Sequence, residues 1–328
     1  MKKIVKRTLL LLTSMLLLVG CASDTSTPAN TDAASDTGTG TESVTEAVPQ
    51  LTPVTPPTAE QIANHEPILL WSEDNIPYVI ENDEKGLMPT VRAYLCEGAD
   101  AAVVIFPGGG YFQLSDVSEG VDIAKAYNDA GYSAFVVNYR YEPYDGRAIL
   151  ADGQRAVQYV RYFTENFSID PDKIALCGFS AGGHLSVMVA EHPVSENRMG
   201  DVVGAARSTP DACILAYPVT TLGEGTFETM PRIFLGENLD NAEEIAKYSY
   251  PHAIDIMPPT FVFYSALDQF VNFEANSIAF ADAMTAAGRD VTIAAYEDGG
   301  HGIGLGTQYA DYAHWHADSV TFLKEHGF

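Results

Sequence analysis

Residues 173–183 read KIALCGFSAGG, and this stretch decides the fold. Its first part is a short apolar run typical of a buried strand, and the apolar residues of 181–191 recur at helical spacing. Gly178-Phe179-Ser180-Ala181-Gly182 joins the two as a sharp turn. Side chains at Gly178 and Gly182 would collide with neighbouring backbone, and the strained turn makes the Ser180 hydroxyl project from the sheet. We therefore predict that Ser180 is a nucleophile.

Short strand-like runs alternate with longer helical runs from about residue 60 to the end of the chain. This pattern predicts an α/β fold with a mostly parallel central sheet and helices on both faces. We expect strands at residues 90–96, 102–106, 133–138, 173–177, 212–217, 260–265 and 291–296. We expect helices at residues 117–130, 147–166, 181–191, 242–248, 273–287 and 309–325. Because no low-complexity break interrupts this part, we predict one domain at residues 60–328.

The composition excludes some classes of protein. Hydrophobic residues make up 46% and charged residues 19% of the chain, which is enough apolar material for a large core. The chain has 18 Lys and Arg against 44 Asp and Glu, a formal net charge of -26. Such a surface repels phosphate backbones and anionic headgroups, which disfavours nucleic-acid binding. The negative charge identifies no ligand, and we interpret it as a source of solubility.

The N-terminal segment is typical of a signal peptide. The basic residues of KKIVKR (2–7) precede an apolar run at 8–19, which is too short to span a membrane, since spanning takes about 20 apolar residues. The run ends in Leu18-Val19-Gly20-Cys21, which resembles the bacterial lipobox, whose cysteine sulfur receives a diacylglycerol. We predict a lipoprotein signal peptide at residues 1–20 with lipidation at Cys21. An ordinary secretory signal with a chance cysteine is the alternative.

Residues 21–59 are rich in Thr, Ser, Ala, Asp, Gly and Pro and poor in large apolar side chains. Such a segment cannot offset the entropy of ordering, so we predict a disordered linker. The chain would then be an extracytoplasmic protein that is lipid-anchored to a bacterial membrane and meets the membrane only through its anchor. The linker would hold the domain clear of the bilayer.

The other cysteines and the histidines give no metal signature. Cys96, Cys177 and Cys213 lie in or beside apolar runs without a paired Cys-x-x-Cys spacing, so each is interpreted as a small buried hydrophobe rather than a ligand. His314 and His316 leave a metal alternative, but a spacing of two places them on different helix faces. We predict neither a metal nor a cofactor.

A glycine loop follows the expected strand at 102–106. Its sequence, Pro107-Gly108-Gly109-Gly110-Tyr111, lets the backbone approach a ligand closely. We predict that the amides of Gly109 and Gly110 join that of Ala181, at a helix N-terminus, in binding a developing negative oxygen. A merely flexible loop is the alternative.

A serine hydroxyl needs a base, and His301 is the candidate because it follows the last expected strand in a glycine-rich loop, EDGGHG (297–302). Asp268, after the strand at 260–265, is the predicted carboxylate that orients the imidazole. Asp255 and Glu274 are its substitutes, although the first precedes the strand and the second already lies in a helix.

The chain order Ser180, Asp268, His301, together with the glycine loop ahead of the serine, resembles the α/β-hydrolase family. Within it, the chain is similar to bacterial acetylesterases of the acetylxylan-esterase type. The residues that carry this likeness are 107–111, 138–141, 169–174, 178–185, 216–218, 235–237, 258–261 and 299–306. The resemblance implies serine hydrolysis of short acyl esters, often acetyl groups on plant polysaccharides or oligosaccharides, without a metal.

The chain departs from the family pattern at two places. The family usually has Asp-x-x-Val-Pro where this chain has Asp268-Gln269-Phe270-Val271-Asn272, and Pro107 stands where many relatives carry His before the three glycines. Neither change removes a group that the chemistry needs. Arg140 and Asp152 are other family-like positions, which we interpret as buried ion-pair or turn residues.

The leading hypothesis is a serine carboxylesterase whose partner is a small-molecule or oligosaccharide ester. Tyr111, Tyr217 and Trp315 could stack on sugar rings, although core packing explains them equally well. A prolyl-type serine peptidase of the same fold is one alternative, but such enzymes usually carry a propeller domain ahead of the hydrolase. A non-catalytic substrate-binding lipoprotein is another, but it generally needs two lobes around a cleft.

Overall fold

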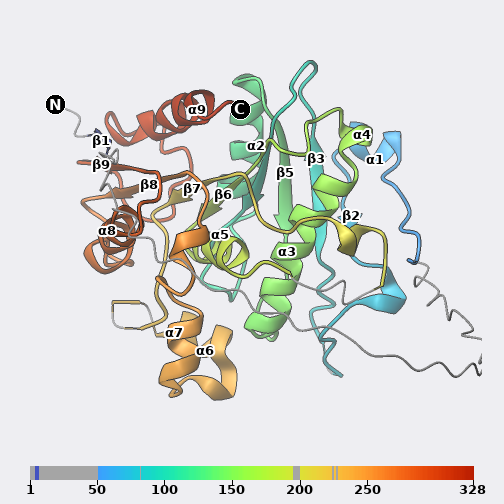
Figure 1. Cartoon of the computed structure of the whole chain (residues 1–328), viewed down its shortest axis with the longest axis horizontal. Coiled ribbons are helices and arrows are strands. Elements are labelled where there is room, and N and C mark those ends of the chain that lie inside the picture. Colours follow the sequence, from blue (N-terminus) through green and yellow to red (C-terminus); the bar gives the residue numbers. More distant parts are fainter. Residues whose placement is uncertain (1–3, 7–50, 82, 195–199, 224, 227) are drawn as a thin grey trace, which may run out of the picture. The chain divides into compact units, whose positions relative to one another are not determined.

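The computed structural model describes residues 4–6 and 51–328, except residues 82, 195–199, 224 and 227 (Figure 1). Nearly all of the expected signal peptide, Cys21 and most of the expected linker lie outside the described residues. Within the described ranges, no helix has both the length and the apolar character needed to cross a bilayer.

The folded part begins before residue 60, where the sequence placed its start. The amide of Thr52 donates to the Gly200 carbonyl at 2.8 Å, and the amide of Val202 donates back to the Thr52 carbonyl at 3.0 Å. Helix α1 (Ala59–Ala63) follows and begins with a capping box between Thr58 and Gln61. Residues 51–59, which the sequence assigned to the linker, therefore belong to the same compact unit as the domain, and Thr52 pairs with its backbone.

A nine-stranded sheet runs in the order β1-β9-β8-β7-β6-β4-β5-β3-β2. The strands from β4 to β9 pair in parallel, whereas β1, β2 and β3 pair antiparallel. Their bounds are β1 (Ile4–Lys6), β2 (Ile68–Leu69), β3 (Thr90–Tyr94), β4 (Ala102–Phe106), β5 (Ser133–Asn138), β6 (Ile174–Phe179), β7 (Ala212–Ala216), β8 (Thr260–Ser265) and β9 (Val291–Tyr296). All the expected strands are present, with ends that differ by at most two residues. The two-residue β2 and the edge strand β1 were not expected.

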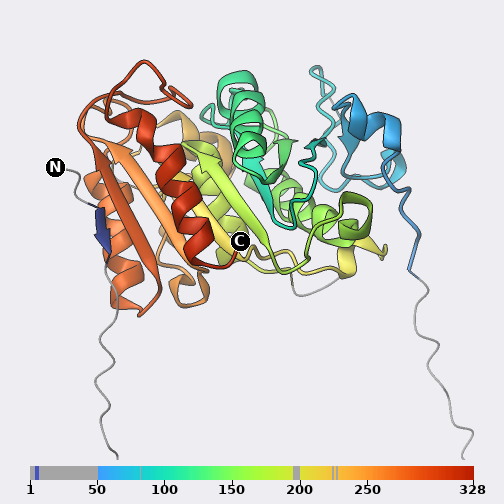
Figure 2. The ribbon, with the colours of Figure 1, turned by 90° about the horizontal axis from the view of Figure 1, so that it is seen from above.

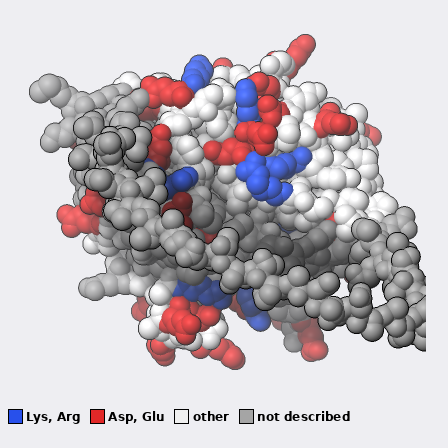
Figure 3. All heavy atoms as spheres, viewed as in Figure 1, with Lys and Arg blue, Asp and Glu red and all other residues white. Residues whose placement is uncertain are grey.

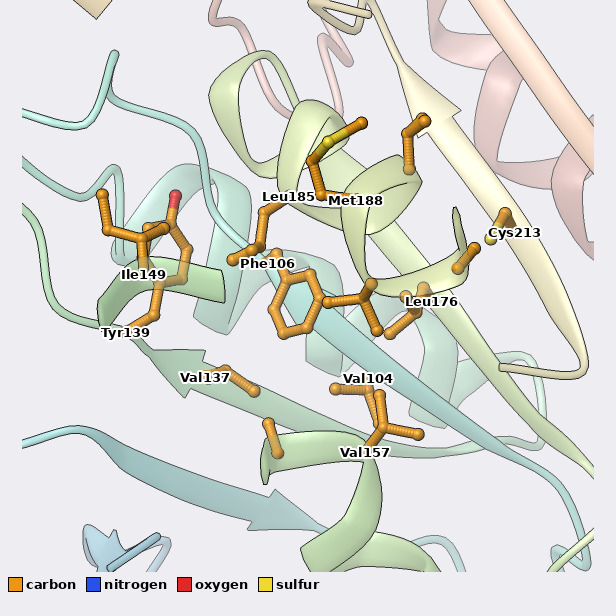
Figure 4. Packing of buried hydrophobic residues seen from close by; sticks show 14 of the residues in the cluster. Val104, Phe106, Val137, Tyr139, Ile149, Val157, Leu176, Leu185, Met188 and Cys213 are labelled. Atoms are coloured by element: carbon orange, nitrogen blue, oxygen red, sulfur yellow. The ribbon is translucent and has the colours of Figure 1, made fainter. Parts of the chain in front are cut away.

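The central strands are apolar along their whole length because both sheet faces are covered. Every residue of β4 and of β6 is buried. Side chains of one face, such as Val104, Phe106 and Leu176, pack against Val157 of α3 and Leu185 of α5 (Figure 4). The core therefore consists of two layers, one on each side of the sheet.

Helices cover the two faces as the alternating pattern predicts. One core layer contains buried residues of α3 (Gly146–Tyr162), α5 (Ala181–Glu191) and α8 (Ala279–Ala286). The other contains residues of α2 (Asp122–Asp129) and α9 (Trp315–Glu325), the helix drawn in red against the strands in Figure 2. This confirms the α/β architecture.

Several expected helices begin or end differently. Wider π-type turns, η2 (Val117–Val121) and η6 (Glu274–Ile278), precede α2 and α8. The helix expected at 147–166 is divided at Phe163 into α3 and the short α4 (Thr164–Phe167), and α9 is preceded by a 3₁₀ turn, η7 (Tyr312–His314). The remaining 3₁₀ turns are η1 (Glu73–Asn75), η3 (Val203–Ala205), η4 (Gly236–Asn238) and η5 (Ile254–Ile256).

Two short helices occupy the long connection between β7 and β8. Helix α7 (Ala242–Lys247) was expected, whereas α6 (Thr229–Leu235) was not. Figure 1 shows α6 beside the lower end of α3. Gly146, the first residue of α3, allows this approach, because a Cβ there would lie 2.5 Å from the Phe234 ring.

Some charged side chains are paired in the interior, and others lie on the surface. Arg140 and Asp152 form the expected buried ion pair with two hydrogen bonds of 2.8 Å, and Trp71 donates to the same carboxylate. On the face shown in Figure 3, Asp and Glu side chains are spread among Lys and Arg side chains.

Candidate active site

The functional candidates meet because they follow neighbouring parallel strands. Ser180 follows β6, Asp268 follows β8 and His301 follows β9, while the glycine loop follows β4. The carboxyl ends of parallel strands lie at one edge of a sheet, which is where open α/β sheets place their ligands. Residues far apart in the sequence are therefore brought to the same edge.

Ser180 lies on the sharp turn that the motif predicts. Its φ of 53° and ψ of -114° are strained, a conformation that costs about 1–3 kcal/mol. A Cβ at Gly178 would lie 2.3 Å from the Gly182 carbonyl oxygen, and one at Gly182 would lie 2.0 Å from the Phe106 carbonyl oxygen. Glycine is thus required on both sides of the serine. The Ser180 amide donates to the Ala216 carbonyl at 3.0 Å, which holds the turn on β7.

The three candidate side chains form one hydrogen-bonded line. His301 Nε2 lies 2.8 Å from Ser180 Oγ, and His301 Nδ1 lies 2.7 Å from Asp268 Oδ2. The Asp268 side chain is 1% exposed, and its other oxygen accepts the amides of Phe270 and Val271 at 2.8 and 3.0 Å. The carboxylate is therefore fixed from both sides and can orient the imidazole.

The substitutes considered for Asp268 lie elsewhere. Asp255 is in η5 ahead of β8, and Glu274 begins η6. The other histidines in the core have structural partners. His184 Nε2 donates to the Tyr248 carbonyl and its Nδ1 accepts the Tyr111 hydroxyl, and burial lowers the pKa of His184 to about 4. An imidazole held neutral in this way packs the core beneath the glycine loop.

The glycine loop adopts backbone conformations that other residues avoid. Gly109 has φ 128° and Gly110 has φ 64°, and a Cβ at Gly109 would lie 2.2 Å from the Gln113 carbonyl oxygen. The loop is an ordered turn, because the amides of Phe112 and Gln113 both donate to the Gly109 carbonyl. These hydrogen bonds give the loop a defined turn at the mouth of the site.

A cavity of about 310 Å³ opens at Ser180 and His301. Gly109 and Gly110 line it, whereas Ala181 is buried at the start of α5. Its apolar walls come from distant segments: Phe112, Val219, Met230, Phe270 and Val271. A short acyl group fits a cavity of this size, and the apolar walls suit its hydrocarbon part.

Sequence reasoning missed two parts of this site. Glu119, on η2, is 1% exposed yet lines the cavity, and nothing in its helical pattern marks it as buried. Phe112 and Phe270 line the cavity while 40% and 68% exposed. Tyr111, Tyr217 and Trp315, the aromatic residues weighed as sugar platforms, are fully buried and belong to the core.

The structure gives no support to the alternative of a metal site at His314 and His316 in the part of the chain that it describes. Within the described ranges, no group of three or more His, Cys, Asp or Glu side chains could hold an ion. His314 is exposed, while the His316 ring packs 4.7 Å from that of Tyr127. Cys177 and Cys213 are buried thiols in adjacent strands, as expected of small hydrophobes.

The sheet order, the strained serine turn and the line of hydroxyl, imidazole and carboxylate define an α/β-hydrolase. More specifically, the chain belongs to the BD-FAE family, whose model matches residues 94–284. The matched range contains the glycine loop, Ser180 and Asp268, while His301 follows it.

Two relatives in sequence have names connected with xylan. The chain is 32% identical over 227 residues to "Acetylxylan esterase" of Xylanibacter ruminicola, covering 68% of this chain and 45% of that protein. It is 33% identical over 228 residues to "Endo-1,4-beta-xylanase B" of Butyrivibrio fibrisolvens, covering 66% of this chain and 34% of that protein. The match therefore spans less than half of either relative.

Solved structures share the fold over most of the domain. An acetyl ester-xyloside bifunctional hydrolase from Caldicellulosiruptor lactoaceticus is 32% identical with a TM-score of 0.76, covering 80% of this chain and 97% of that one. The apo form of Thermogutta terrifontis esterase 2 is 25% identical with a TM-score of 0.66, covering 81% and 96%. The expected fold is thus confirmed.

Proposed function

We propose that the chain is a serine carboxylesterase that removes short acyl groups, acetyl foremost, from xylan-derived or other carbohydrates. The observation that carries this proposal is the continuous line from Asp268 through His301 to Ser180, with distances of 2.7 and 2.8 Å. The names of the relatives, an acetylxylan esterase and an acetyl ester-xyloside hydrolase, support the same chemistry.

The reaction proceeds in two acyl transfers. Ser180 Oγ attacks the acyl carbonyl carbon while His301 Nε2 takes the hydroxyl proton. The bond to the alcohol oxygen then breaks, and the imidazolium gives that proton to the leaving alcohol. Water, deprotonated by the same imidazole, attacks the acyl carbon. The bond from that carbon to Ser180 Oγ then breaks, the imidazolium returns its proton to Oγ, and the carboxylic acid leaves. Asp268 stabilises the imidazolium in both steps.

The tetrahedral intermediate carries a negative oxygen that needs donors. We assign this role to the amides of Gly109, Gly110 and Ala181. Two features support it: the two glycines line the cavity beside Ser180, and Ala181 is the first residue of α5, where the helix dipole favours negative charge. One such donor contributes about 3–4 kcal/mol to lowering the barrier in well-studied enzymes.

The residues that line the cavity favour a substrate in which a short acyl group is joined to a sugar. The apolar lining suits an acyl methyl group, and the exposed rings of Phe112 and Phe270 lie beside the same cavity. A sugar ring presents C–H groups to an aromatic face, so exposed aromatic rings next to the nucleophile favour a carbohydrate alcohol portion.

The decisive experiment compares the wild type with Ser180→Ala. We expect the variant to keep its fold and to lose hydrolysis of p-nitrophenyl acetate and acetate release from acetylated xylo-oligosaccharides by at least about 10³-fold. Ser186→Ala, on the same helix, is the matched control, because its hydroxyl donates to the Gly182 carbonyl and not to a residue of the Ser180, His301 and Asp268 line. Unchanged turnover in Ser180→Ala would refute the proposal, and cleavage of proline-containing peptides instead of esters would favour the peptidase.

We also propose that the mature chain begins at a lipidated Cys21, so that it lacks the edge strand β1 (Ile4–Lys6), and that it is anchored outside the bacterial cytoplasm. The support is the basic start, the apolar run at 8–19 and the lipobox-like Leu18-Val19-Gly20-Cys21. Expression in bacteria fed a tritiated fatty acid should label the wild type and not Cys21→Ser. Label in neither protein would refute the anchor without affecting the proposed esterase.

A further inference from the structure

A buried carboxyl group lies behind the glycine loop and has no place in the reaction described above. Glu119 is on η2, the turn that links the loop to α2, and is 1% exposed. Burial raises its pKa above the ordinary carboxyl value, which the hydrogen bonds described below only partly oppose. A carboxyl group buried at such a cost next to a nucleophile calls for an explanation.

The two carboxyl oxygens of Glu119 bind two different parts of the site. Oε2 accepts the amide of Gly108 at 2.9 Å, and Oε1 accepts the hydroxyl of Tyr217 at 2.6 Å. Gly108 directly precedes the two glycines that line the cavity, while Tyr217 directly follows β7. Glu119 therefore joins elements that come from opposite sides of Ser180.

On one side, Glu119 fixes the start of the glycine loop. The Gly108 amide is held by Oε2, and the Pro107 carbonyl, one residue earlier, accepts the Tyr139 hydroxyl at 2.5 Å. A Cβ at Gly108 would lie 2.7 Å from Oε2 and 2.8 Å from the Phe179 carbonyl oxygen, so the loop is already pressed against the serine turn. A shift at Gly108 would be passed to the amides of Gly109 and Gly110.

On the other side, Glu119 fixes the Tyr217 side chain, whose ring packs against the imidazole of His301. Tyr217 has φ 35°, a strained value for a tyrosine, and its amide donates to the Phe263 carbonyl at 2.8 Å. Its ring centre lies 4.8 Å from that of His301. Losing the hydrogen bond to Glu119 would let the Tyr217 ring, and with it the imidazole, change orientation.

We propose that Glu119 is a positioning residue that holds the oxyanion-binding amides and the His301 imidazole in one geometry through Gly108 and Tyr217. This inference rests on the proposed esterase function. Its effect is on the transition state, because the groups that it holds through Gly108 and Tyr217 are those that bind the developing negative oxygen and move the proton. Small displacements of such groups are costly to catalysis.

Two substitutions distinguish the effect of side-chain length at position 119 from the effect of its charge. Glu119→Gln removes the charge but keeps the length, so its amide oxygen can accept from Gly108 while its NH₂ group donates to the Tyr217 oxygen. Glu119→Asp keeps the charge but is one methylene shorter, so it cannot meet both partners. Glu191→Gln is the matched control, because Glu191 is equally buried but lies at the far end of α5.

The measurements are kcat and KM for p-nitrophenyl acetate, the rate at which a fluorophosphonate labels Ser180, and the melting temperature. We expect Glu119→Asp to lower kcat and the labelling rate together by about 10- to 100-fold, with KM changed less than about two-fold. Glu119→Gln should keep kcat within about five-fold of the wild type, and Glu191→Gln should equal it.

Either of two outcomes would overturn the inference. If Glu119→Asp lowers the melting temperature but keeps kcat and the labelling rate, the residue is only structural. If Glu119→Gln loses more activity than Glu119→Asp, the charge of the side chain matters and not its length. Fluorophosphonate labelling requires no ester substrate, so failure of the proposed esterase, seen as no acetate release by the wild type, is a separate result.

Discussion

His301 Nε2 lies 2.8 Å from Ser180 Oγ, although 121 residues separate the two in the sequence. The contact exists because β6 and β9 run parallel in one sheet and end at the same edge. Each residue is then fixed locally, the serine by its strained turn and the histidine by Asp268.

Asp268 should determine which imidazole nitrogen carries the proton. In Asp268→Asn the amide group can present its NH₂ to Nδ1, which favours the tautomer that cannot accept the serine proton. We expect kcat for p-nitrophenyl acetate to fall by about 10³- to 10⁴-fold with an unchanged melting profile. Asp255→Asn, which alters the substitute candidate ahead of β8, should behave as the wild type. More than a tenth of normal kcat in Asp268→Asn would contradict this role.

Gly182→Ala should damage the serine turn. The new Cβ would lie 2.0 Å from the Phe106 carbonyl oxygen, so α5 and β4 must separate. We expect urea denaturation to show a loss of about 1–3 kcal/mol in the free energy of unfolding, together with a loss of activity. Gly300→Ala is the control, because no atom lies within 4 Å of a Cβ there. Equal stability of the two variants would count against the steric account.

Glu191 should make stability depend on pH. Burial raises its pKa from 4.5 to about 8, so the unfolded chain loses this proton at a lower pH than the folded chain. The stabilising contribution is therefore complete below about pH 4.5 and is lost as the pH rises towards 8. Relative to the wild type, Glu191→Gln should gain up to roughly 1.4 kcal/mol per pH unit across this window.

The measurement is urea denaturation of the wild type and Glu191→Gln at pH 5 and pH 8. A difference in unfolding free energy that is the same at both values would show that the carboxyl group titrates normally. His184 and His192, whose pKa values burial lowers to about 4, act in the opposite direction and are present in both proteins. Their contribution therefore cancels in the comparison.

Phe270 should matter for the sugar part of a substrate. Its ring is 68% exposed beside the cavity, and loss of an aromatic contact costs about 0.5–1.5 kcal/mol. We expect Phe270→Ala to lower the ratio of kcat/KM for acetylated xylo-oligosaccharide to that for ethyl acetate by about 2- to 10-fold. Leu267→Ala, 55% exposed on the same loop but outside the cavity lining, should leave the ratio unchanged. A ratio that falls equally in both variants would contradict a specific contact between the Phe270 ring and the sugar.

The sequence predicted the strands well because the central ones are continuous apolar runs. The bounds of β4, β5, β8 and β9 agree with those expected. Helix ends were harder, because they depend on packing and hydrogen bonds from distant residues. Tyr312, for example, donates its amide to the Asp298 carboxylate at 2.7 Å, and the last helix begins after it rather than at 309.

Local sequence determined the serine turn, its glycines and the order of the three polar residues, because each depends on neighbours in the chain or on the end of a strand. Tertiary structure alone decided that the carboxyl group of residue 119 is buried beside the nucleophile and that Phe112 and Phe270 border the cavity. A helical pattern gives the face of a side chain relative to its own axis. The pattern cannot predict which loop from another part of the chain will pack over that face. The burial of the side chain, its pKa and the shape of the cavity all depend on that packing.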